Sequence, residues 1–145
     1  MRLIGKRNHK WLPMMLMFAI GTGSSSAQQD GFGGVSLASQ YFSDAEGWGQ
    51  SNTYYDAIRL ADVNGDGKPD LCGRGYAGIV CSLGNGDRTF GPLNVWTSDF
   101  SNAAGWGDPQ YGTTVMFADI NNDGSVDVCG RGSAGIQCAL SNHLE

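Results

Sequence analysis

Short runs of alternating hydrophobic and polar residues, each bounded by glycine, asparagine or aspartate, predict β-strands along the chain. Four such runs lie in its middle: Ile58 to Asp62, Asp70 to Arg74, Ile79 to Leu83 and Phe90 to Trp96. No window has the helical hydrophobic period of about 3.6 residues. The chain has 23 glycines among 145 residues, which agrees with a β protein that needs many tight turns. We therefore expect an all-β fold.

The sequence repeats itself after 57 residues. Ala57 to Leu83 returns without a gap as Thr114 to Leu140. The second copy therefore carries the first three strands again, at Val115 to Asp119, Asp127 to Arg131 and Ile136 to Leu140.

A further copy of the fourth strand lies near the N-terminus. The pattern Phe-Gly-x-hydrophobic-x-hydrophobic that begins at Phe90 also begins at Phe32, which predicts a strand over Phe32 to Ser39. If the strands of one repeat are lettered A to D, their order along the chain is D, A-B-C-D, A-B-C. Four-stranded units that repeat every 40 to 60 residues, roughly, are typical of β-propeller blades. We expect two such blades.

An acidic loop joins strands A and B in each repeat, at Asp62 to Asp70 and at Asp119 to Asp127. Each loop places oxygen-bearing side chains at positions 1, 3, 5 and 9, with a glycine at position 6 that permits a sharp turn. Ca²⁺ takes about six to eight oxygen ligands, so we expect one Ca²⁺ in each loop. The expected ligands, including the carbonyls of Lys68 and Ser125, are Asp62, Asn64, Asp66, Lys68 and Asp70, and Asp119, Asn121, Asp123, Ser125 and Asp127.

Alternative loop types fit this sequence less well. Metal-free Asx turns would leave three carboxylates in each loop repelling one another. The loops are not EF-hands, because position 12 is Gly73 or Gly130 instead of a bidentate glutamate. Dockerin-type loops are followed by a helix, whereas Cys-Gly-Arg-Gly follows here. Extracellular calcium modules bind with dissociation constants of about 10⁻⁴ to 10⁻³ M, so we expect the ion to stabilise the loop and to carry no chemistry.

The four cysteines lie symmetrically about two predicted hairpin turns. Folding strand B onto strand C places Cys72 opposite Cys81 and Cys129 opposite Cys138, within reach of a disulfide. We expect these two local pairings among the three connectivities that four cysteines allow. Zinc is the alternative, but the sequence has no Cys-x-x-Cys motif and both histidines lie outside the repeat.

Residues 1–27 have the features of a secretory signal peptide. Basic residues precede the apolar run Trp11 to Ile20, and small residues lead to an expected cleavage after Ala27. The run is too short to span a bilayer of about 30 Å, which argues against a membrane anchor. The rest of the chain has five basic and fourteen acidic residues, a net charge of −9, which disfavours nucleic acid and anionic membranes as partners. We expect a secreted protein, extracellular or periplasmic, in a compartment that permits disulfides.

Trp48 and Trp106 each lie between two glycines. They are either sugar-stacking platforms of a glycan site or, as we favour, large aromatic groups packed between blades. Arg74 and Arg131, at the ends of the two B strands, are expected to be solvated or paired.

Catalysis finds no support in the sequence. The only histidine beyond residue 27 is His143, and no cysteine is left to act as a nucleophile. A glycosidase needs a pair of carboxylates, but the acidic residues outside the two loops form no recurrent pair. We therefore expect no enzyme.

These residues resemble the FG-GAP/VCBS repeats of integrin α-chain-like, calcium-binding β-propellers. The resemblance lies in the loop Ala-Asp-x-Asn-x-Asp-Gly-x-x-Asp after an apolar strand, in the Phe-Gly and Gly-Trp elements before it, and in the hairpin after it. It implies four-stranded blades that hold calcium between strands A and B. Some fungal lectins with similar blades bind amino sugars, so the resemblance also implies a carbohydrate-binding lectin as an alternative function.

The resemblance further implies that strand D leads from one blade into the next, so this chain has a surplus D strand first and lacks one last. We expect copies to exchange this strand head to tail and to build a ring or an extracellular filament. The expected function is a non-enzymatic, calcium-binding structural or adhesive protein that self-assembles. The expected segments are the signal peptide 1–27, the donor strand 28–41, the first blade 42–98 and the second blade 99–145.

Overall fold

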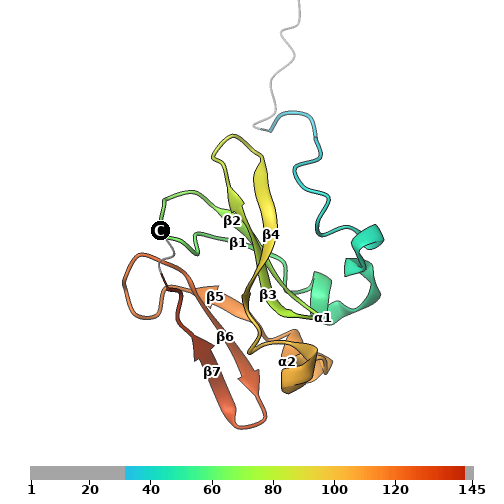
Figure 1. Cartoon of the computed structure of the whole chain (residues 1–145), viewed down its shortest axis with the longest axis vertical. Helices are drawn as coiled ribbons and strands as arrows, with labels where there is room; N and C mark the ends of the chain where they lie inside the picture. Colours follow the sequence, from blue (N-terminus) through green and yellow to red (C-terminus); the bar gives the residue numbers. More distant parts are fainter. Residues whose placement is uncertain (1–31, 143–145) are drawn as a thin grey trace, which may run out of the picture. The chain divides into compact units, whose positions relative to one another are not determined.

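The structure is a computed structural model that describes residues 32–142 (Figure 1). All the described helices and strands lie in one compact unit, which begins at Val35. The predicted signal peptide and its cleavage site lie outside the described residues.

The first sheet has four antiparallel strands in the order β1-β2-β3-β4. They are β1 (Arg59–Ala61), β2 (Asp70–Gly75), β3 (Gly78–Gly84) and β4 (Phe90–Thr97). Each strand pairs with the next along the chain. The acidic loop joins β1 to β2, and shorter turns join β2 to β3 and β3 to β4. The four strands predicted for this repeat are therefore confirmed, with ends shifted by one residue at most.

The second sheet has three antiparallel strands in the order β5-β6-β7 (Figure 1). They are β5 (Met116–Ala118), β6 (Asp127–Gly132) and β7 (Gly135–Ala139). Their register repeats that of the first sheet, since Met116 lies opposite Cys129 as Arg59 lies opposite Cys72. The fold is thus all-β, with sheets of four and three strands that agree with propeller-like blades, the second lacking a fourth strand among the described residues.

The first strand of the predicted order is not formed. Residues 33–39 have no regular secondary structure in this single chain, and most of them are exposed. A strand outside a sheet leaves its N–H and C=O groups without partners, so the sequence pattern alone does not produce one. The donor role predicted for 28–41 requires a partner strand and stays a prediction.

Short helical turns, which the sequence analysis missed, precede each sheet. They are η1 (Asp44–Glu46), η2 (Trp48–Gln50), α1 (Asn52–Tyr55), η3 (Asn102–Trp106) and α2 (Pro109–Gly112). Elements of three to five residues are too short to show a helical hydrophobic period. Within residues 32–142, no helix is both long and apolar enough to cross a membrane.

Both predicted disulfides are present. Cys72 bonds to Cys81 across β2 and β3, and Cys129 bonds to Cys138 across β6 and β7. In each hairpin the two cysteines are direct cross-strand partners with Cα atoms 4.1 Å apart. Two disulfides are typical of an extracellular or otherwise oxidising environment.

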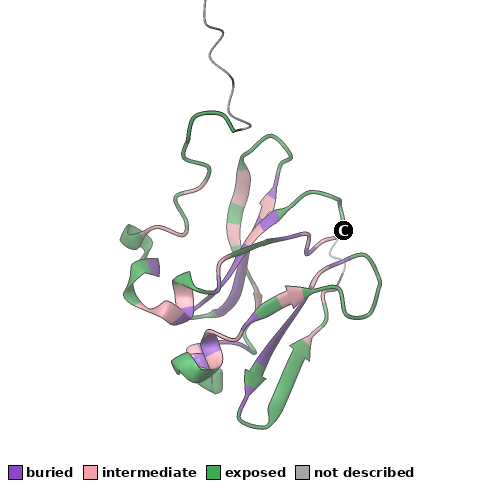
Figure 2. Cartoon of the chain, turned by 180° about the vertical axis from the view of Figure 1, so that it is seen from behind, coloured by how far each residue is buried: buried purple, intermediate pink, exposed green. Residues whose placement is uncertain are grey.

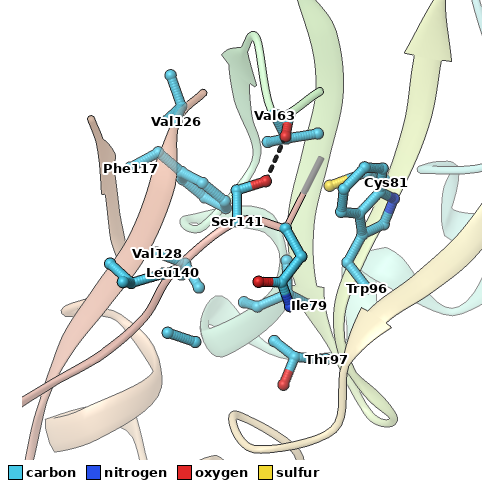
Figure 3. A pocket seen from close by; sticks show the side chains of 12 residues that line it. Val63, Ile79, Cys81, Trp96, Thr97, Phe117, Val126, Val128, Leu140 and Ser141 are labelled. Carbon is cyan, nitrogen blue, oxygen red and sulfur yellow. Dashed lines mark hydrogen bonds between the residues drawn. The ribbon is translucent and has the colours of Figure 1, made fainter. Parts of the chain in front are cut away.

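The two sheets share one hydrophobic core. Figure 3 shows its opening, where Val63 and Ile79 of the first repeat face Phe117 and Val128 of the second. Hydrogen bonds also join the repeats beside this core: the Val126 amide donates to the Asp62 carbonyl at 2.8 Å, and the Ser141 hydroxyl donates to the Val63 carbonyl.

Candidate functional site

The first acidic loop is folded around the carboxylate of Asp62. Its Oδ1 accepts hydrogen bonds from the amides of Gly65 (2.8 Å) and Asp66 (3.1 Å), and its Oδ2 accepts one from Gly67 (2.8 Å). Gly67 has a φ of +80°, a backbone conformation that glycine adopts without a steric penalty. The glycine at position 6 is therefore needed for the turn that closes the loop.

The amide of Asp66 brings two further oxygens together. It donates to Asp62 Oδ1 and, at 3.2 Å, to Asn64 Oδ1, so both oxygens lie beside the same N–H group. The second loop repeats this arrangement, since the Asp123 amide donates to Asp119 Oδ1 at 3.2 Å and to Asn121 Oδ1 at 3.1 Å. Positions 1 and 3 of both loops thus converge.

Position 5 differs between the two loops. In the first, Asp66 Oδ2 lies 2.9 Å from Lys68 Nζ, and Oδ1 accepts a hydrogen bond from the Lys68 amide. The hydrogen bond from the Lys68 ammonium is the main cause that lowers the pKa of Asp66, and the same pair raises the pKa of Lys68. In the second loop Asn121 Nδ2 donates to Asp123 Oδ2 at 2.7 Å.

Position 9 has a structural role that the sequence analysis did not foresee. Asp70 is fully buried, and its two oxygens accept hydrogen bonds from the amides of Val63 (2.9 Å) and Gly84 (2.8 Å). Asp127 is its equivalent: it accepts from Ile120 at 3.0 Å and from Ser141 at 2.7 Å. Burial is the main cause that raises the pKa of Asp70, and the two amides oppose it. Each aspartate therefore fastens the acidic loop to the end of the third strand.

The donor set of each loop consists of oxygen atoms, which is the ligand chemistry that Ca²⁺ prefers. Positions 1 and 3 converge, and Asp66 lies on the exposed side of the first loop. Across residues 32–142, however, no three carboxylate, histidine or cysteine side chains meet as a metal-binding group. The residues fit calcium in type and spacing, and Asp66 would have to exchange its contact with Lys68 for the ion.

The two tryptophans pack onto the sheets. Trp48 and Trp106 are only 7% and 5% exposed. Each indole lies beside a phenylalanine ring, Phe42 at 4.4 Å and Phe100 at 4.5 Å between centroids. A Cβ placed on Gly73 would lie 2.9 Å from the Trp48 ring, and a Cβ placed on Gly130 would lie 2.5 Å from the Trp106 ring. The tryptophans therefore pack against the sheet of their own repeat, whereas we had favoured packing between blades.

A surface pocket nevertheless opens beside Trp48. It is lined by Glu46, Gln50 and Tyr54 from the helical turns, by Tyr76 from the β2–β3 turn and by Leu93 from β4. A pocket in the second repeat shares part of this wall, since its Ala104, Trp106 and Gln137 correspond to Glu46, Trp48 and Val80. Aromatic rings next to polar groups in a hollow can bind a small polar ligand with apolar faces.

Arg74 is the residue that the sequence analysis described least accurately. Its side chain is fully buried, and its Nε donates to the Phe100 carbonyl at 2.8 Å. Nη1 donates to Thr53 Oγ1 at 3.1 Å and Nη2 to Asn102 Oδ1, while the guanidinium lies 5.5 Å from the centre of the Tyr54 ring. Burial lowers the pKa of this guanidinium. Arg74 thus connects the first sheet to the segment that leads into the second. The only sequence signal for this role was that the arginine recurs in the second repeat, as Arg131.

The comparisons with known proteins agree with these features. The model of the FG-GAP-like repeat matches residues 62–129, which span both acidic loops. A solved structure, described as the basis of specific recognition of non-reducing terminal N-acetylglucosamine by an Agrocybe aegerita lectin, is similar to this chain with a TM-score of 0.54 and 36% identity. The match covers 59% of this chain and 21% of the lectin, so the chain spans about a fifth of the lectin's length. No curated protein matches the chain.

The matched segment contains the features on which the resemblance was based: both acidic loops, the hairpin between them and the start of the second hairpin. Over residues 62–129, the chain therefore matches the FG-GAP-like repeat, in agreement with the resemblance.

Proposed function

We propose that this protein binds carbohydrate and takes glycans that end in N-acetylglucosamine or a related amino sugar. The observation that carries the proposal is the similarity to the Agrocybe aegerita lectin, at 36% identity and a TM-score of 0.54. The chain spans about a fifth of that lectin. The similarity therefore supports a sugar site formed within these repeats, and it does not support the number of sites that the whole lectin has.

The pocket beside Trp48 is the proposed sugar site. Tyr76 is 73% exposed at its rim and offers a ring face to the C–H groups of a sugar. Glu46 and Gln50 supply acceptors and donors for hydroxyl and acetamido groups. Trp48 itself would form the floor, because it is packed on Gly73 and shows little of its surface.

Calcium is proposed as a structural ion of both acidic loops. Asp62, Asn64 and Asp66 would supply ligands in the first loop, and Asp119, Asn121 and Asp123 in the second. When bound, the ion would neutralise carboxylates that lie close together and stiffen the loop. No catalytic step is proposed for it, and we propose a binding role for the protein instead of an enzymatic one.

Self-assembly of a secreted protein is the second candidate function. It is favoured by a specific observation: β7 has a partner on one side only among the described residues, while β3, its equivalent, has a partner on both. Assembly and glycan binding are compatible, because several weak sugar sites in one particle gain avidity.

Isothermal titration calorimetry tests the proposed carbohydrate binding directly. The purified protein in 1 mM CaCl₂, an assay concentration of about the affinity range of such modules, is titrated with an N-acetylglucosamine-terminated oligosaccharide. The same oligosaccharide capped with galactose is the control. We expect saturable heat with the first ligand and none with the second. Equal heats, or no heat with either, would contradict the proposal.

A further inference from the structure

β7 presents an open edge in the structure of one chain. In the first sheet β3 pairs with β2 and with β4, and almost all of its residues are buried. β7 pairs with β6 alone within residues 32–142, and Ile136 is 66% exposed. Figure 2 shows β7 as an exposed strand beside a buried one. A strand edge with unpaired N–H and C=O groups is a template for another strand.

Arg131 lies where Arg74 lies in the first sheet, at the end of the neighbouring strand. The two arginines share one contact, since Arg131 is 5.7 Å from the ring centre of Tyr111 as Arg74 is 5.5 Å from that of Tyr54. They differ in their hydrogen bonds. The Arg131 guanidinium is exposed and donates none within residues 32–142, whereas Arg74 holds the segment that follows β4.

Residues 32–44 have the sequence of a partner for the open β7 edge and for the Arg131 guanidinium. With a shift of 58 residues, Phe32 corresponds to Phe90 at the start of β4, Phe42 to Phe100 and Asp44 to Asn102. The segment 33–39 forms no strand, and its Leu37 is 74% exposed. Asp44 is exposed as well, and it offers a carboxylate where Asn102 offers an amide.

The geometry points to a second copy of this chain as the partner of the β7 edge. Residues 32–39 of one copy pair with β7 of another, and Arg131 then binds the Phe42 carbonyl and the Asp44 carboxylate of the incoming copy. Inside the chain the equivalent contact joins a charged arginine to the neutral amide of Asn102, so the opposite charges of Arg131 and Asp44 make the contact between copies stronger. This inference rests on the proposed self-assembly and specifies the residues through which two copies would bind.

The β3–β4 pairing sets the register of this contact. Val80 lies opposite Val95, and the repeat places Gln137 at the position of Val80 and Leu37 at that of Val95. Leu37 of one copy is therefore expected opposite Gln137 of the other.

Two contacts between the sheets cannot recur between copies. Pro69 has no N–H to donate in place of Val126, and Gly84 has no hydroxyl in place of Ser141. The contact between copies therefore lacks these two hydrogen bonds, and the donated strand and Arg131 supply others.

Charge reversal tests the contact in the full chain. Multi-angle light scattering after size exclusion measures the mass of the wild type and of Arg131→Asp, Asp44→Arg and the double variant. We expect a concentration-dependent assembly for the wild type, self-association at least about tenfold weaker for each single variant, and recovery in the double variant. Arg59→Asp, an exposed arginine on β1, is the matched control and should assemble as the wild type does.

Cross-linking tests the register independently of affinity. Copies with Leu37→Cys are mixed with differently tagged copies with Gln137→Cys, and we expect a mixed disulfide dimer. Ala38→Cys, which lies on the other face of the donated strand, should give much less of it. A wild type that stays monomeric would overturn both the assembly and this contact. An assembled wild type that is insensitive to both single variants would overturn the Arg131 contact. An assembled wild type whose cysteine variants do not cross-link would overturn the pairing of residues 32–39 with β7.

Discussion

The Nε of Arg74 donates a hydrogen bond to the main-chain carbonyl of Phe100 across 2.8 Å, from the end of β2 to the segment between the sheets. This guanidinium is fully buried and has no carboxylate among its hydrogen-bond acceptors, which are a carbonyl, a hydroxyl and an amide oxygen. The charge is therefore compensated by dipoles and by the face of Tyr54. Such an arrangement depends on the fork of donors that arginine alone provides.

Arg74→Lys should therefore destabilise the protein at least as much as Arg74→Met. Lysine keeps the cost of burying a charge but cannot reach three acceptors, whereas methionine removes the charge together with the donors. We expect a loss of about 2 kcal/mol or more in the free energy of unfolding for lysine, measured by urea denaturation. Arg131→Lys is the control and should change stability by less than about 0.5 kcal/mol. A lysine variant as stable as the wild type would refute the assigned role of Arg74.

Asp70→Asn should destabilise the calcium-free protein. Both carboxylate oxygens accept main-chain N–H groups, and an asparagine would turn one of them into an NH₂ group that faces a donor. A buried donor without an acceptor costs about 1–3 kcal/mol, so we expect a loss of that size in urea with a chelator present. Asp56→Asn, on an exposed residue, should be nearly neutral. Equal stability of the two variants would contradict the fastening role of Asp70.

Calcium should raise the melting temperature, and magnesium at the same concentration should raise it less, because Mg²⁺ gives up its water shell reluctantly. At 1 mM ion and a dissociation constant of about 10⁻⁴ to 10⁻³ M, each site adds about 0.4–1.4 kcal/mol. Differential scanning calorimetry with CaCl₂, MgCl₂ or a chelator measures the shift. The variant Asp62→Ala with Asp119→Ala should lose the calcium response. Equal melting temperatures with CaCl₂ and with chelator would refute the calcium sites.

Much of the fold could be predicted because its signals are local. Alternation marked the strands, and the symmetric placement of Cys72 and Cys81 about a glycine-bounded turn fixed both the hairpin and the disulfide. The 57-residue repeat then transferred each prediction to the second sheet.

What could not be predicted depends on contacts between distant residues. Arg74 is buried only because segments 21 to 28 residues away in sequence supply its acceptors. Asp70 matched a metal-ligand position, and its use as an acceptor for Gly84 depends on how β3 ends. The strand pattern at 32–39 was visible in the sequence, but a strand also needs a neighbour, and residues 32–142 of one chain do not supply it.

Gly130→Ala should destabilise the protein, because the added methyl group would lie 2.5 Å from the Trp106 ring. The ring is held between Phe100 and the sheet and cannot move aside, so we expect a loss of about 1–3 kcal/mol from overpacking. Gly33→Ala is the control, since nothing lies within 4 Å of its added Cβ. Thermal denaturation compares the two. A neutral Gly130→Ala would show that the indole is free to move, as a stacking platform would need.

Tyr76→Ala should weaken the binding of an N-acetylglucosamine-terminated oligosaccharide without affecting folding. Tyr76 is 73% exposed at the rim of the Trp48 pocket, so its loss removes a sugar contact but little packing. Stacking of one aromatic ring contributes about 1 kcal/mol, which predicts a dissociation constant about fivefold higher in calorimetry. Tyr55→Ala removes a half-exposed tyrosine outside the pocket and should bind as the wild type does. If both variants bind equally, the sugar site lies elsewhere, and the Gln137 pocket of the second repeat becomes the next site to mutate.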